Sequence, residues 1–163
     1  MLRPDQVLVI YDGECPFCSG VAHWLRRLDW RDRLVCLPYQ TRQLPEAVGT
    51  TVQRARKTAL AFSPAGRLWH AFGAVAASLD ALLPFGLPIF RAIYGVPGLH
   101  GLLDRLYFFV SNHRDKLPHG PPDLAEGNEP ALDPQVREEL SRRRLATHMP
   151  SALPGPPLAE TLH

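Results

Sequence analysis

The sequence has few of the features that assign a chain to a common class. Its 163 residues include only three cysteines, whereas the disulfide framework of a small secreted protein needs an even number. A net charge of +2 is too small to indicate nucleic acid or an acidic partner. No run approaches the roughly eighteen apolar residues of a membrane span, and residues 7–11 are too short for a signal-peptide core. We therefore expect a cytoplasmic protein without nucleic-acid or membrane partners.

The composition fits one globular domain. An apolar fraction of 45% and a charged fraction of 21% are ordinary, and the length suffices for one core. The 17 prolines are unevenly spread and are frequent from Leu117 onward. We expect an ordered domain at residues 5–116. Residues 117–163 are expected to hold a Pro-rich linker, a short charged helix at residues 133–144 and a disordered tail from residue 150.

Hydrophobic patterning predicts an α/β fold with a small mixed sheet flanked by helices. Residues 7–11 (VLVIY) and 33–39 (RLVCLPY) read as strands joined by a helix that starts at Pro16, which makes a βαβ unit with parallel strands. Residues 58–62 and 67–72 flank Ser-Pro-Ala-Gly, which is typical of a β-hairpin turn. Further helices are predicted at residues 45–56, 73–83, 89–94 and 99–110.

Two of the three cysteines lie in CPFC, where the first strand gives way to the helix. If Cys15 is the N-cap and Pro16 the first helical residue, the Cys15 sulfur can accept a hydrogen bond from the Cys18 N–H. Partial positive charge at the helix N-terminus favours a thiolate and lowers a cysteine pKa. We predict that Cys15 attacks a substrate disulfide, and that Cys18, the more buried thiol, then releases the reduced substrate. This chemistry requires no bound cofactor.

Two acidic residues, Asp12 and Glu14, precede the thiol pair, and their carboxylates oppose ionisation of a nearby thiol. For Asp12 two interpretations stay open: it transfers a proton during exchange, or it forms an Asp-Gly turn without chemistry. Phe17, between the cysteines, either contacts substrate or anchors the loop in the core.

The stretch YDGECPFC resembles the DCC family of thiol-disulfide oxidoreductases, which is defined by a YDGxCxxC pattern. The positions that fill this pattern are Tyr11, Asp12, Gly13, Cys15 and Cys18. Weaker similarity extends to about residue 117, through Gly73 and Ala76 and through the segment from Tyr107 to Arg114. The chain departs from the family at Val75 and Asp115. It also has no proline at residues 56–58, where thioredoxins carry a cis-proline.

The resemblance implies a thioredoxin-like fold and thiol-disulfide exchange with a disulfide-containing protein or a small thiol. CPFC is closer to the glutaredoxin motif than to that of thioredoxin, so glutathione or a thioredoxin-type donor is the expected external reductant. We assign Cys15, Cys18 and Asp12 to catalysis. The predicted substrate contacts are Tyr11, Gly13, Pro16 and Phe17.

Two other functions fit the same residues. The pair could bind a metal or an iron–sulfur cluster with two further ligands, for example from a second subunit, or the domain could be a non-catalytic thioredoxin-like binding module. We predict structural roles for the other notable residues. These are Cys36, Trp24, Trp30 and Trp69 in the core, His23 facing solvent, His113 and Arg114 complementing a helix dipole, and Arg142 to Arg144 on a solvated helix face.

Overall fold

The computed structural model describes residues 2–84, 87–117 and 120–148, so the tail predicted to be disordered lies outside the described residues. The described residues form a four-stranded sheet in the order β2-β1-β3-β4. Its strands are β1 (Val7–Tyr11), β2 (Leu34–Pro38), β3 (Leu60–Phe62) and β4 (Leu68–His70). β1 runs parallel to β2 and antiparallel to β3, which pairs antiparallel with β4. The predicted mixed sheet, a βαβ unit plus a hairpin, is confirmed.

Helices account for most of the remaining described chain. They are α1 (Pro16–Leu28), α2 (Leu44–Ala47), α3 (Val52–Lys57), α4 (Ala71–Leu82), α5 (Ile89–Tyr94), α6 (Leu99–Asn112), a 3₁₀ turn η2 (Arg114–Lys116) and α7 (Pro134–His148). The helix predicted at residues 45–56 is divided into α2 and α3, because Gly49 adopts a φ of 80° that a continuing helix cannot use. Within the described ranges, no helix is both long enough and apolar enough to cross a bilayer.

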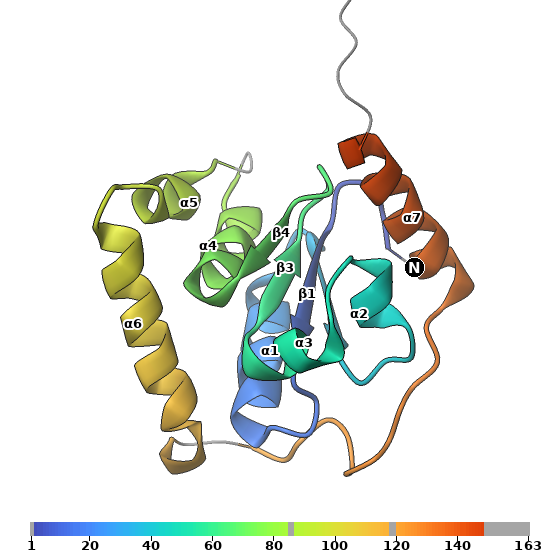
Figure 1. Ribbon diagram of the computed structural model, residues 1–163, viewed down its shortest axis with the longest axis horizontal. Helices are drawn as coiled ribbons and strands as arrows, with labels where there is room; N and C mark the ends of the chain where they lie inside the picture. Colours follow the sequence, from blue (N-terminus) through green and yellow to red (C-terminus); the bar gives the residue numbers. More distant parts are fainter. Residues whose placement is uncertain (1, 85–86, 118–119, 149–163) are drawn as a thin grey trace, which may run out of the picture.

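β1 is buried on both faces because helices cover both sides of the sheet. Val7, Val9 and Tyr11 belong to the core cluster that includes residues of α1 and α4. Leu8 and Ile10 belong to the opposite cluster, which includes residues of α2, α3 and α7. Figure 1 shows α4, α5 and α6 on one side of the sheet and α7 on the other. An uninterrupted apolar strand is therefore what this position requires.

α7 and Leu132, which precedes it by two residues, lie beyond the predicted range 5–116, yet Leu132, Val136 and Leu140 belong to the core. The helix also carries Arg143, which was predicted on a solvated face; that prediction is wrong. Arg143 is 4% exposed. Its guanidinium pairs with Glu139 at 3.0 Å and donates hydrogen bonds to two backbone carbonyls of the N-terminal segment at 2.9 and 2.7 Å.

The buried residues of α1 are Ser19, Ala22 and Leu25, and Ala22 and Leu25 belong to the core cluster beside β1. Trp24 is 55% exposed, and Trp30, which follows the helix, is 77% exposed. The predictions that place these two tryptophans in the core are wrong. The predicted core positions are confirmed for Trp69, which packs against the core cluster, and for Cys36, which is buried. His23 faces solvent, as predicted.

Candidate functional site

The CPFC loop forms the cap geometry that the sequence predicts. Cys15 is the N-cap of α1 with extended backbone angles, and Pro16 is the first helical residue. The Cys15 sulfur accepts a hydrogen bond from the Cys18 N–H at 3.3 Å. All three cysteines are free thiols. One of the N–H groups that a helix N-terminus leaves unpaired is thus aimed at a sulfur atom.

The two thiols have opposite acidities. Hydrogen bonding from the Cys18 thiol, followed by the Cys18 N–H and the positive charge of Arg114, lowers the pKa of Cys15 to about 6, although burial and Asp12 oppose this. The pKa of Cys18 is raised by its hydrogen bond to Cys15, by burial and by the charge on Cys15. The two directions favour the state in which Cys15 is the thiolate and Cys18 keeps its proton.

The exposure of the two cysteines is the reverse of the prediction. Cys15 is only 8% exposed, whereas Cys18 is partly exposed and lines an open pocket. The prediction that Cys18 is the more buried thiol therefore does not hold for solvent exposure, although burial among protein atoms contributes to the raised pKa of Cys18. Cys15 lies in a loop across which another segment of the chain runs, as described below.

The Asp12 carboxylate is held by a local network. Its Oδ1 accepts hydrogen bonds from the Glu14 N–H at 3.2 Å and from the Gln40 amide at 2.9 Å. Gln40 in turn accepts the Gly13 N–H at 3.1 Å, which fixes the loop against the residues after β2. The Oδ2 atom is left facing Arg114, with 3.8 Å between it and Nη2. Asp12 therefore forms the turn and also places a charge near the thiols.

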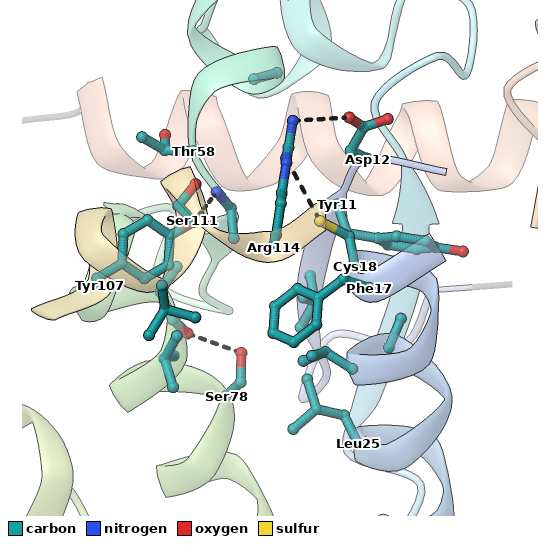
Figure 2. Close-up of a pocket in the computed structure, with 18 of the residues that line it drawn as sticks. Tyr11, Asp12, Phe17, Cys18, Leu25, Thr58, Ser78, Tyr107, Ser111 and Arg114 are labelled. Carbon is teal, nitrogen blue, oxygen red and sulfur yellow. Dashed lines mark hydrogen bonds and ion pairs between the residues drawn. The ribbon is translucent and has the colours of Figure 1, made fainter. Parts of the chain in front are cut away.

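Arg114 is the cation of the site. It follows α6, and its Nη1 lies 3.7 Å from the Cys18 sulfur, as the dashed line in Figure 2 shows. The prediction that Arg114 only complements a helix dipole is wrong, because its guanidinium bridges Cys18 and Asp12. His113 is different: its Nδ1 lies 2.8 Å from the Phe109 carbonyl oxygen at the end of α6, as expected for a dipole-complementing residue.

A largely apolar pocket of about 350 Å³ opens beside Cys18, among residues of α1, α4 and α6. Its walls include Val21, Trp24, Leu25, Ala74, Val75 and Val110. Figure 2 shows Phe17 and Tyr107 facing this space from opposite sides, with Cys18 and Arg114 at one end. Tyr107 also accepts the Ala59 N–H at 2.7 Å, which ties α6 to the start of β3. Of the predicted substrate contacts, Tyr11 and Phe17 line the pocket, while Gly13 and Pro16 lie outside its lining.

A family model described as DCC1-like thiol-disulfide oxidoreductase matches residues 9–119. The chain belongs to the DCC1-like thiol-disulfide oxidoreductase family. This confirms the resemblance inferred from YDGECPFC, and with it the thioredoxin-like fold and a general redox function for the protein. No curated protein and no solved structure matches the chain. The family match contains both cysteines of the pair, Asp12, Arg114 and the residues that line the pocket.

The DCC1-like motif carries a glycine between its aspartate and its first cysteine, and the structure gives a reason. A Cβ on Gly13 would lie 2.8 Å from the Pro38 Cβ and 2.9 Å from the Leu124 side chain, closer than side chains approach. The Leu124 N–H donates to the Gly13 carbonyl at 2.9 Å, and the Gly127 N–H donates to the Glu14 carboxylate at 3.0 Å. The segment interpreted from sequence as a linker therefore runs across the motif.

The same segment contributes Asp123, which the sequence analysis did not single out. Its carboxylate accepts a hydrogen bond from the Tyr11 hydroxyl and lies 2.8 Å from the His23 ring. The pKa of Tyr11 is raised by burial and by this carboxylate. In the part of the chain that the structure describes, no group of three or more His, Cys, Asp or Glu side chains is placed to hold a metal ion.

Proposed function

We propose that the protein is a dithiol–disulfide exchange enzyme in which Cys15 is the nucleophile and Cys18 is the resolving thiol. The observation that carries the proposal is the geometry at the N-terminus of α1, where the Cys15 sulfur accepts the Cys18 N–H at 3.3 Å, and the opposite pKa shifts of the two thiols agree with it. With a pKa of about 6, Cys15 is largely thiolate at neutral pH, and the thiolate is the form that attacks disulfides. Cys18 keeps its proton until a mixed disulfide has formed.

The reaction proceeds in two exchanges. The Cys15 thiolate bonds to one substrate sulfur, and the other substrate sulfur leaves as a thiolate that takes up a proton from solvent. Once Cys15 is bonded to substrate it carries no charge, so it no longer stabilises the protonated form of Cys18. Cys18 then loses its proton and attacks the Cys15 sulfur, which forms the Cys15–Cys18 disulfide and releases the second substrate thiolate. Two electrons pass from the cysteine pair to the substrate.

Two charged residues assist the second exchange in this proposal. Arg114 stabilises the Cys18 thiolate as it forms, since its guanidinium already lies 3.7 Å from that sulfur. Asp12 takes the proton from Cys18 through an intervening water molecule, since its Oδ2 lies 3.8 Å and the Cys18 sulfur 3.7 Å from the same Arg114 guanidinium. No bound cofactor is needed, since the electrons move directly between sulfur atoms.

The substrates we propose are disulfides in proteins or small molecules, and an external donor such as glutathione or a thioredoxin-type protein restores the dithiol. We place the reaction in the cytoplasm, where thiols are kept reduced. Tyr11, Gly13, Pro16 and Phe17 are proposed to contact substrate, and the partial exposure of Phe17 beside the pocket supports that role for it.

Single cysteine variants test this division of labour with a small disulfide substrate. Cys15→Ser is expected to abolish turnover, whereas Cys18→Ser is expected to accumulate a mixed disulfide on Cys15 that intact-mass measurement detects. Cys36→Ala is the matched control, because burial raises the pKa of Cys36 to about 11 and keeps it unreactive. Equal residual turnover in Cys15→Ser and Cys18→Ser would contradict the proposal. Stoichiometric zinc or iron in the reduced protein would favour the metal-binding alternative.

A further inference from the structure

The two sulfurs of the pair face different surroundings. Cys18 lines the apolar pocket, whereas Cys15 is not part of the pocket lining and is 8% exposed. A small molecule in the pocket therefore meets the oxidised pair at Cys18, whereas a disulfide substrate reacts at Cys15, outside the pocket lining.

The direction of approach matters for thiol–disulfide exchange. The attacking thiolate lines up with the S–S bond, and the sulfur on the far side leaves. A thiol that attacks Cys18 from the pocket therefore expels Cys15. A sulfur with a low pKa leaves faster, and Cys15 is the one whose thiolate is stabilised by the Cys18 N–H. Attack from the pocket thus displaces the better leaving group.

The pocket has its own chemical preference. Its walls are mostly apolar, and its volume of about 350 Å³ lies near the lower end of the roughly 300–1,000 Å³ of small-molecule sites. The charged residues in its lining are Arg56, Lys57 and Arg114, opposed by the single carboxylate of Asp12. Arg56 and Lys57 are exposed at the end of α3 and free to meet a ligand's charge. An apolar ligand that carries a negative group satisfies both features.

We propose that the pocket binds a small anionic thiol with an apolar arm, and that this thiol reduces the oxidised pair by attacking Cys18. The proposal rests on the dithiol–disulfide exchange proposed above. The first thiol loses its proton and bonds to Cys18, and Cys15 leaves as a thiolate. A second thiol molecule attacks the sulfur of the first and releases Cys18, which takes up a proton. Two thiols become one disulfide, and the protein gains the two electrons.

The test measures how fast three thiols reduce the oxidised full-length protein. 4-(Mercaptomethyl)benzoate carries an aryl arm and a carboxylate, 3-mercaptopropionate carries only the carboxylate, and 2-mercaptoethanol is neutral. Each rate is divided by that thiol's rate with bis(2-hydroxyethyl) disulfide, which cancels intrinsic reactivity. We expect the aryl thiol to be favoured over 3-mercaptopropionate by about tenfold, from burial of its ring.

Two variants connect this preference to the pocket. Val21 lines the pocket and is 41% exposed, so Val21→Trp fills the space without disturbing the core and is expected to remove the aryl preference. Val52→Trp is the matched control, because Val52 is 48% exposed on α3 and lies outside the lining. Lys57→Glu is expected to slow both anionic thiols severalfold relative to 2-mercaptoethanol.

The outcomes separate this proposal from the function on which it rests. If 2-mercaptoethanol reduces the pair and the aryl thiol shows no preference, or keeps its preference in Val21→Trp, the pocket proposal is overturned and disulfide exchange stands. If no thiol reduces the pair, both fail. The dipeptide Phe-Cys gives a further outcome. If it reduces the oxidised pair faster than the aryl thiol does, and its rate is unchanged in Val21→Trp, the reductant binds outside the pocket and the proposal is overturned.

Discussion

Replacing Cys18 with alanine removes the hydrogen-bond donor that contributes most to the low pKa of Cys15. A hydrogen bond to a charged group is worth about 1.5–3 kcal/mol, and about 1.4 kcal/mol corresponds to one pH unit. The pKa of Cys15 should therefore rise from about 6 by about one to two pH units. At pH 7 the thiolate fraction falls from about nine-tenths to between about a half and a tenth.

The assay is the rate of alkylation by iodoacetamide as a function of pH. The wild-type midpoint is expected near pH 6, and the Cys18→Ala rate at pH 7 should be about two- to tenfold lower than that of wild type. Cys18→Ser is the matched variant, because its hydroxyl still donates, so its midpoint should lie between the other two. Cys36 does not interfere, since burial raises its pKa to about 11.

Two results would refute the electrostatic account of the site. One is a wild-type midpoint near the value of a free cysteine, about 8.5. The other is a Cys18→Ala midpoint equal to that of wild type, which would mean that the Cys18 thiol does not stabilise the Cys15 thiolate.

The remaining predictions concern stability and are measured by urea denaturation. Arg143→Met removes a buried guanidinium and should lower the free energy of unfolding by about 3–5 kcal/mol, whereas the exposed Arg142→Met should change it by less than about 1 kcal/mol. Gly13→Ala introduces a clash and should cost about 1–3 kcal/mol; Gly20→Ala, which meets nothing within 4 Å on α1, should instead stabilise. Tyr107→Phe leaves the N–H at the start of β3 without its acceptor and should cost about 1–3 kcal/mol. An unchanged unfolding midpoint in Arg143→Met, Gly13→Ala or Tyr107→Phe would contradict the packing or hydrogen bond that the variant is expected to disturb.

The parts of the fold that the sequence predicts are those that local patterns determine. Residues 7–11 are all apolar or aromatic because β1 is covered on both faces, and the run is recognisable without any knowledge of its partners. The cap of α1 is equally local, because Cys15, Pro16 and Cys18 lie within one helical turn. The pairing of sulfur with a helix N-terminus could therefore be predicted in atomic detail.

Side chains that reach the site from a distance could not be predicted in this way. Arg114 lies 96 residues from Cys18 in the sequence. Apart from the weak family similarity of the segment from Tyr107 to Arg114, its surroundings are those of an ordinary helix-terminal cation. Trp24 shows the related problem for apolar residues. It shares a helical stripe with Phe17 and Val21, which looks like a core-facing stripe, but that stripe lines the pocket while a neighbouring side of α1 packs on the sheet.

Arg143 illustrates a third limit. Three consecutive arginines on a charged helix are normally solvated, and their sequence does not indicate that one of them is buried. The burial depends on two carbonyl groups near the opposite end of the chain, which only the folded structure brings within reach.

The position of α7 has a practical consequence for anyone who truncates this protein. The family match ends at residue 119, yet Leu132, Val136 and Leu140 beyond it cover the sheet face that carries Leu8 and Ile10. A recombinant fragment trimmed to the matched region would expose that apolar sheet face to water and would be prone to aggregate. Deletion work and domain fusions should therefore retain the chain through residue 148.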